Sequence, residues 1–146
     1  MVSLQTRPSI MDRAKYEFFA GIDSNNNSLW SSDFSLRKPV FEDLRGVGWN
    51  TSVSYNAGLG RYLLITENTE SFVGRFGIYD APEPWGPWTT VSDGTFGDGV
   101  IAPTTFFYNF SNKWASTDGK EFVLIFTGIG ENDSWNSVKG TFLLSR

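Results

Sequence analysis

Hydrophobic and polar residues alternate in short runs along most of the chain, and clusters of Gly, Asn, Asp and Pro separate these runs. Alternation with a period of two is typical of strands with one buried face, and helical spacing is almost absent. Several short strands between turn signals are typical of a sandwich, barrel or propeller. The pattern therefore predicts an all-β fold. The expected strands cover residues 16–21, 29–33, 38–42, 51–55, 61–66, 72–79, 88–92, 104–108, 113–116, 121–126 and 137–144.

Two segments between the expected strands have clear turn signatures. Residues 23–27 read Asp-Ser-Asn-Asn-Asn, and residues 56–60 read Asn-Ala-Gly-Leu-Gly. Asn, Asp and Gly tolerate the left-handed backbone that tight turns need. The first segment also has oxygen-bearing side chains at alternate positions, as a calcium loop does. An EF-hand would require Gly and Glu where Ser28 and Phe34 stand, so we expect a hairpin turn.

The chain contains an internal repeat. Residues 51–56 (TSVSYN) match residues 104–109 (TTFFYN), and each is followed by a turn and an apolar strand. Tyr55 and Tyr108 lie 53 positions apart. A four-stranded unit of about 40–50 residues is typical of a propeller blade. We therefore expect one propeller-like domain, with a part-blade at about residues 14–43 and blades at about 48–92 and 102–146. In this scheme Tyr55-Asn56 and Tyr108-Asn109 are equivalent.

Two and a half blades do not close a ring, because propellers have at least about four. The expected blades therefore belong to a longer protein or are completed by association. A homo-oligomer is one solution, since two copies in a symmetric dimer would supply a five-bladed ring. Light scattering that shows a stable monomer would exclude the dimer.

Composition restricts the chemistry. The 146 residues carry a net charge of −4, with a pI of about 4.7, so no nucleic acid partner is expected. The chain has no Cys and no His, which excludes disulfides, thiolate or imidazole metal sites and His-dependent triads. Catalysis would have to use Asp, Glu, Tyr, Lys or Arg, and we expect no cofactor and no metal.

No apolar run approaches the roughly 18 residues of a membrane helix, so no membrane partner is expected. The localisation stays open because a leader can belong to a longer parent chain. A secreted or periplasmic parent protein is compatible with the sequence.

Three stretches are similar to a known class of protein. They are residues 54–62 (SYNAGLGRY), 79–89 (YDAPEPWGPWT) and 113–122 (KWASTDGKEF). Together they resemble the C-terminal half of five-bladed propellers of the glycoside-hydrolase type, over about residues 37–146. Each stretch also has a plain role as a turn, so we assign all three to folding.

The resemblance implies that ligands contact the loops entering the inner strands and the loops between the second and third strands. These loops are residues 43–50, 93–103, 67–71 and 130–136. They carry Trp, Asn and acidic side chains, which suit stacking on a sugar ring and hydrogen bonding to its hydroxyls. The expected substrate-binding residues are Trp49, Asn50, Glu131, Trp135 and Asn136. The expected catalytic residues are Glu67, Glu70 and Asp133.

Hydrolysis of a glycoside requires two carboxyl groups about 5–9.5 Å apart. Glu67 or Glu70, paired with Asp133, would supply them from adjacent blades. The hydrolases that the chain resembles carry key carboxylates near the start of inner strands, whereas residues 50–52 and 103–105 contain no acid here. Whether the chain is an enzyme is therefore left open.

We expect a carbohydrate-active domain that acts on or binds a poly- or oligosaccharide. The alternatives are a non-catalytic carbohydrate-binding module and a structural, self-assembling fragment. A carboxyl pair in one cleft would favour the enzyme. Exposed Trp faces without such a pair would favour the binding module, and buried Trp without a cleft would favour the structural protein.

Overall fold

The computed structural model describes residues 11–48, 50–68, 73–97, 100–128 and 134–144. The chain divides into two compact units, Met1–Glu42 and Asp43–Arg146. The described residues form nine strands in three antiparallel sheets of two, four and three strands, which confirms the all-β expectation. Among these residues no helix has the length and apolar character needed to cross a membrane.

The first unit contains a two-stranded hairpin of β1 (Phe18–Ile22) and β2 (Ser28–Ser31). One Asp23 carboxylate oxygen accepts hydrogen bonds from the backbone N–H groups of Asn25 and Asn27, at 2.8 and 2.9 Å. An Asp that bonds to the backbone two residues ahead is a standard way to close a turn. The expected hairpin turn is therefore confirmed.

Two short 3-10 turns complete the described part of this unit, η2 (Arg13–Lys15) and η3 (Phe34–Leu36). The strand predicted over residues 38–42 is wrong, because these residues have no strand structure. Lys38 donates one backbone hydrogen bond to Phe19 O, at 2.8 Å. Pro39 follows it and has no N–H group, so the pairing cannot continue.

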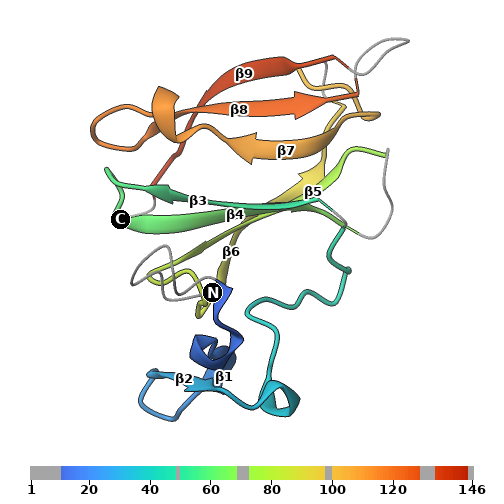
Figure 1. The fold of residues 1–146 in the computed structure, drawn as a ribbon. Coiled ribbons are helices and arrows are strands. Elements are labelled where there is room, and N and C mark those ends of the chain that lie inside the picture. The colour runs from blue at the N-terminus through green and yellow to red at the C-terminus, as the bar shows by residue number, and fades with distance from the viewer. Residues whose placement is uncertain (1–10, 49, 69–72, 98–99, 129–133, 145–146) are drawn as a thin grey trace. The chain divides into compact units, whose positions relative to one another are not determined.

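The second unit contains the other two sheets. One has the order β3 (Thr51–Asn56), β4 (Arg61–Glu67), β5 (Arg75–Ala81), β6 (Thr89–Thr95). The other has the order β7 (Phe106–Phe110), β8 (Glu121–Thr127), β9 (Asn136–Thr141). Every hydrogen-bonded neighbour within a sheet is also the neighbour in sequence. The two sheets lie one above the other in Figure 1, and β7 contacts both β3 and β4.

The core of the second unit lies between these two sheets. Its buried side chains are aliphatic or aromatic, and they come from β4, β7, β8 and the segment before β7. Burial of such side chains is the main force that holds two sheets together. The core residues are Leu63, Ile65, Ile101, Tyr108, Phe110, Leu124 and Phe126.

The strand predicted over residues 113–116 is also wrong. Residues Asn112–Trp114 form a 3-10 turn, η4, in which Trp114 N–H donates to Ser111 O. The loop then returns to the sheet, where Ser116 N–H donates to Glu121 O at 3.0 Å. This local hydrogen bonding takes the place of a strand. The described part of the second predicted blade therefore forms a sheet of three strands, whereas that of the first predicted blade forms a sheet of four.

The registers of the two sheets place the Tyr-Asn pairs differently. Asn56 pairs with Arg61, the first residue of β4. Asn109 pairs with Ile125, which lies four residues after the start of β8. A bulge between Phe106 and Asn109 also shifts the second register. The expected equivalence of the two Asn residues is therefore wrong at the level of strand pairing.

Candidate functional site

A pocket of about 380 Å³ lies in the second unit, beside the turn between β3 and β4 and the loop between β7 and β8. We call it the turn-end pocket. Small polar residues and aromatic residues make up most of its lining. Its lining residues are Ser54, Tyr55, Asn56, Ala57, Gly58, Leu63, Phe110, Ser111, Asn112, Ala115, Ser116, Thr117 and Phe122.

Asn56 joins the two segments that border the pocket. Its side-chain Nδ2 donates to Gly119 O at 2.8 Å, and its Oδ1 accepts from Leu59 N–H at 3.1 Å. The Asn56 residue is only 7% exposed, and its hydrogen bond to Gly119 is shielded from water. A buried hydrogen bond of this kind fixes position because leaving either group unpaired is costly.

Two glycines allow the segments to meet at backbone distance. A Cβ atom on Gly58 would overlap the backbone of Gly119, and its distance to Gly119 Cα would be 2.6 Å. Gly119 itself has a φ of 72°, in the left-handed region that favours glycine. The turn-end pocket therefore depends on a close backbone contact between residues that are far apart in sequence.

The turn-end pocket is uncharged, since none of its described lining residues is Asp, Glu, Lys or Arg, and its surface is more apolar than polar. The side chains of Ser54, Ser111 and Asn112 form no hydrogen bond to other described residues. Phe110 and Phe122 provide an aromatic wall, with ring centroids 5.2 Å apart. Free hydroxyl and amide groups beside aromatic rings suit a neutral ligand that is rich in hydroxyls.

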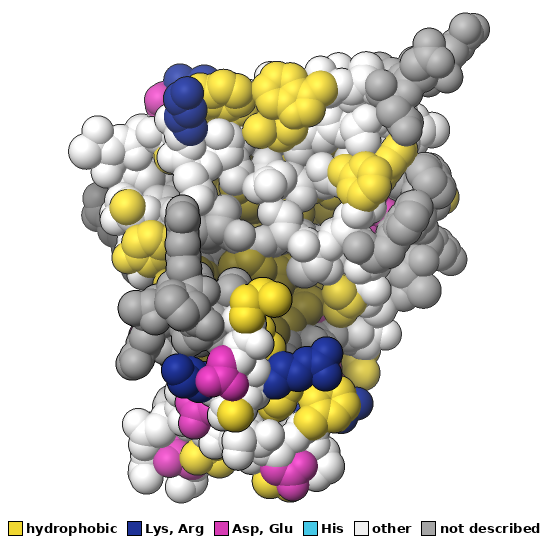
Figure 2. Space-filling model, in the orientation of Figure 1, with side chains coloured by type: hydrophobic (Ala, Val, Ile, Leu, Met, Phe, Trp, Pro, Cys, Tyr) yellow, Lys and Arg dark blue, Asp and Glu magenta, His cyan; other side chains and the backbone are white. Residues whose placement is uncertain are grey.

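The surface over the three-stranded sheet β7–β9 also carries few charged side chains in one view of the molecule. In the view of Figure 2, the face over β7–β9 shows mainly uncharged and hydrophobic side chains, with few charged ones. Tyr55 adds an exposed ring at the pocket, at 46% exposure. The pocket lining therefore offers a charged ligand no ion-pair partner, whereas Lys113, Asp118 and Lys120 lie in the loop beside it.

Glu67, an expected catalytic residue, lies at the other end of β4. It is 2% exposed, and its Oε1 accepts a hydrogen bond from Phe107 N–H at 3.0 Å. Phe107 has a positive φ of 56° in the β7 bulge, a strained conformation for a bulky residue. Burial raises the pKa of nearby Tyr108 to about 12, and the Glu67 carboxylate contributes to the shift. Glu67 thus links β4 to β7 from a buried position.

Asn50, an expected substrate-binding residue, directly precedes β3. The pairing of Thr51 with Thr66 places Asn50 and Glu67 at the same end of the β3–β4 hairpin, where Gly48 N–H donates to Glu67 O at 2.7 Å. Asn50 Nδ2, Glu67 Oε2 and Asn68 Oδ1 are all buried without a hydrogen-bond partner among the described residues. Two of the expected site residues, Asn50 and Glu67, therefore lie at the opposite end of the β3–β4 hairpin from the turn-end pocket.

Trp135 and Asn136 lie at the start of β9. Trp135 is 66% exposed, and its ring contacts Trp114 edge to face, with centroids 6.0 Å apart. The Asn136 side chain donates to both Ser134 O and Ser134 Oγ, at 2.9 and 2.8 Å. These hydrogen bonds stabilise the backbone immediately before β9. Trp135 is the expected site residue that the structure leaves most open to a ligand. The other expected site residues, Trp49, Glu70, Glu131 and Asp133, lie outside the described residues.

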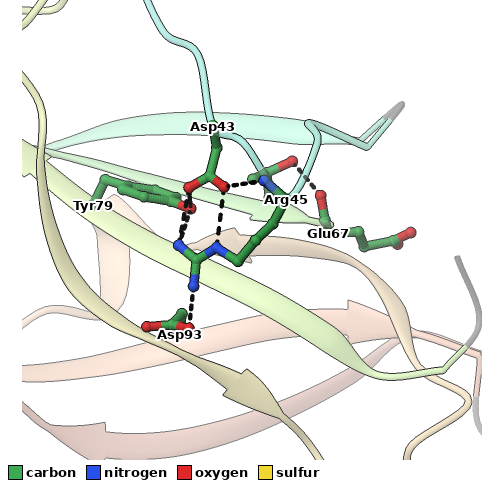
Figure 3. Close-up of polar contacts among 6 residues, drawn as sticks. Asp43, Arg45, Glu67, Tyr79 and Asp93 are labelled. Carbon is green, nitrogen blue, oxygen red and sulfur yellow. Dashed lines mark hydrogen bonds and ion pairs between the residues drawn. The ribbon is translucent and has the colours of Figure 1, made fainter. Parts of the chain in front are cut away.

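A cluster of polar side chains surrounds Arg45 (Figure 3). Asp43 accepts hydrogen bonds from the Arg45 side chain and from the hydroxyl of Tyr79 on β5. Arg45 also forms an ion pair with Asp93 on β6. The cluster therefore fastens the segment before β3 to the outer half of its sheet. Within the described residues, no group of His, Cys, Asp or Glu has an arrangement that would hold a metal ion.

The Arg45 cluster predicts a pH dependence of stability. The hydrogen bonds from Arg45, together with that from Tyr79, hold the pKa of Asp43 well below its usual range. Burial raises the pKa of Tyr79 to about 12. Asp43 therefore stabilises the fold above the unfolded pKa of about 4, and this contribution is lost as the pH falls further. Tyr79 stabilises the fold below about pH 10, and this contribution is lost as the pH rises through the folded pKa.

Urea unfolding of wild type and Asp43→Asn across this pH range tests the prediction. The wild type should be the more stable protein at neutral pH, and the difference should shrink in acid. Glu83→Gln, at an exposed carboxylate in the turn after β5, is the control and should leave the profile unchanged. A difference between wild type and Asp43→Asn that stays constant down to strong acid would contradict the assignment.

No protein-family model matches this chain, and no curated protein matches it in sequence. The resemblance to propellers of the glycoside-hydrolase type therefore stays a prediction. Sequence reasoning missed the turn-end pocket, although it recognised the turns at residues 56–60 and 116–119. It assigned both to folding, because nothing in either segment alone shows that Asn56 reaches Gly119.

Proposed function

We propose that this chain is part of a β-propeller that binds a neutral saccharide in the turn-end pocket. The observation that carries the proposal is an uncharged pocket with free hydroxyl and amide groups beside an aromatic wall. Saccharides present many hydroxyls, which pair with such groups, and apolar ring faces, which pack against aromatic rings. A pocket of about 380 Å³ lies within the range that small-molecule sites occupy.

The order of the strands supports the propeller proposal. Both sheets of the second unit are simple meanders, as propeller blades are. The first strand of the second sheet, β7, packs on the first two strands of the other sheet. In a propeller these first strands would line the central channel. The last strands, β6 and β9, would be the outer strands of their blades.

Binding is a better proposal than hydrolysis for the described residues. Glu67 is buried and accepts a backbone hydrogen bond, and its proposed partners for catalysis, Glu70 and Asp133, are not among these residues. The turn-end pocket offers no acid for a general acid or a nucleophile. The pocket and the exposed Trp135 also favour a binding role over a purely structural one.

A pocket-filling substitution tests the proposal. Ala115 lines the turn-end pocket, is exposed and has an extended backbone, so Ala115→Trp should place an indole in the pocket without straining the fold. We expect the affinity for a neutral disaccharide to fall by at least about tenfold, or ~1.4 kcal/mol. Isothermal titration calorimetry would measure it, with the disaccharide chosen by screening glucose, xylose, mannose, galactose and arabinose units.

Val91→Trp is the matched control, because Val91 is exposed on β6 and does not line the pocket. It should leave the affinity unchanged. Both variants should keep the wild-type free energy of unfolding to within about 0.5 kcal/mol. Equal affinities in wild type and Ala115→Trp would place the ligand elsewhere and overturn the proposal.

A further inference from the structure

Two tryptophans form an exposed pair on the second sheet. Trp114 ends η4 and is 46% exposed, and Trp135 precedes β9 and is 66% exposed. Their rings meet at an interplanar angle of 68°. Trp is usually well buried because it is large and mostly apolar. An edge-to-face contact holds each ring in place while leaving much of the indole surface open.

One member of the tryptophan pair is next in sequence to residues that line the turn-end pocket. The three-residue turn η4 contains both Asn112, which lines the pocket, and Trp114. The next residue, Ala115, also lines the pocket. One short segment, residues 112–115, therefore carries both lining residues of the pocket and one ring of the exposed aromatic pair.

We infer that the tryptophan pair extends the site, so that the ligand is a neutral oligosaccharide longer than the pocket alone can hold. This inference rests on the proposed function. One end of the ligand occupies the turn-end pocket, where free amide and hydroxyl groups meet its hydroxyls. The units outside the pocket pack their C–H faces on Trp114 and Trp135, because indole offers a broad apolar face.

Saccharides of two lengths distinguish binding at the tryptophan pair from binding in the turn-end pocket. The affinities of a disaccharide and a hexasaccharide of the same neutral sugar are measured by calorimetry for wild type, Trp135→Ala and Trp135→Phe. We expect wild type to bind the hexasaccharide roughly tenfold more tightly than the disaccharide, since stacking residues commonly dominate binding. Trp135→Ala should abolish this gain and leave the disaccharide affinity unchanged. Trp135→Phe should restore part of the gain, because it restores an aromatic face.

The outcomes of this experiment separate a failure of the tryptophan extension from a failure of the proposed function. Equal wild-type affinities for the two lengths, or a gain that survives Trp135→Ala, would overturn the extension while the pocket stands. A loss in Trp135→Ala that is the same for both lengths would also overturn it, because Trp135 would then act on the pocket. If wild type binds neither saccharide, the proposed function fails and the extension fails with it. Thermal unfolding of both variants checks that the exposed substitutions leave the fold intact.

Discussion

Glu67→Ala is expected to lower the free energy of unfolding by roughly 2–4 kcal/mol. The substitution removes the acceptor of the Phe107 N–H group, which lies in the strained bulge of β7. It also leaves a cavity at a position that is almost fully buried. Both effects act on the contact between β4 and β7, which holds the two sheets of the second unit together. Urea unfolding would measure the loss.

Glu67→Gln is the matched variant, because its amide oxygen can still accept from Phe107 N–H. Glu67→Gln should lower the free energy of unfolding much less than Glu67→Ala does. If the chain proves to hydrolyse a glycoside, the same variant separates structure from chemistry: a stable Glu67→Gln protein without turnover would assign a catalytic role to Glu67. Wild-type stability in Glu67→Ala would contradict the structural role described above.

Gly119→Ala is expected to abolish saccharide binding and to destabilise the fold by about 2 kcal/mol more than Gly60→Ala does. A Cβ atom on Gly119 would overlap Asn56 Oδ1 and would lie 2.7 Å from Leu59 N. It would therefore break the contact that joins the two segments around the turn-end pocket. Denaturant unfolding and calorimetric titration measure the two effects.

Gly60 provides a close control for the backbone conformation. Its φ of 64° resembles the 72° of Gly119, but a Cβ atom on Gly60 would have nothing within 4 Å. Gly60→Ala should therefore show only the strain of a left-handed alanine, about 1 kcal/mol. Equal costs for the two variants would mean that the contact between Asn56 and Gly119 does not stabilise the protein.

The sequence was most informative where one physical signal dominates. Short runs of strand-forming residues between turn signals predicted all four strands of the first sheet of the second unit, although β4 is buried over most of its length and β6 is exposed throughout. Asp23 and the following Asn residues predicted the first hairpin turn, since their side chains bond to the local backbone. These signals depend on residues close in sequence, so they can be seen without the fold.

Contacts between distant residues were not predictable in this way. A period of two does not specify which residue of one strand faces which residue of the next, so the repeat suggested an equivalence of Asn56 and Asn109 that the registers contradict. The hydrogen bond from Asn56 to Gly119 joins residues that no local pattern relates. The burial of Glu67 is also a tertiary effect, since a carboxylate at a strand end is normally expected to face water.

The most direct test of the proposed function is calorimetric titration of the wild-type chain with neutral, acidic and basic oligosaccharides at low and high salt. Because the turn-end pocket has no charged lining residue, we expect neutral saccharides to bind and salt to leave their affinity unchanged. Binding confined to acidic or basic saccharides and weakened by salt, or no saccharide binding at all, would contradict the proposed function.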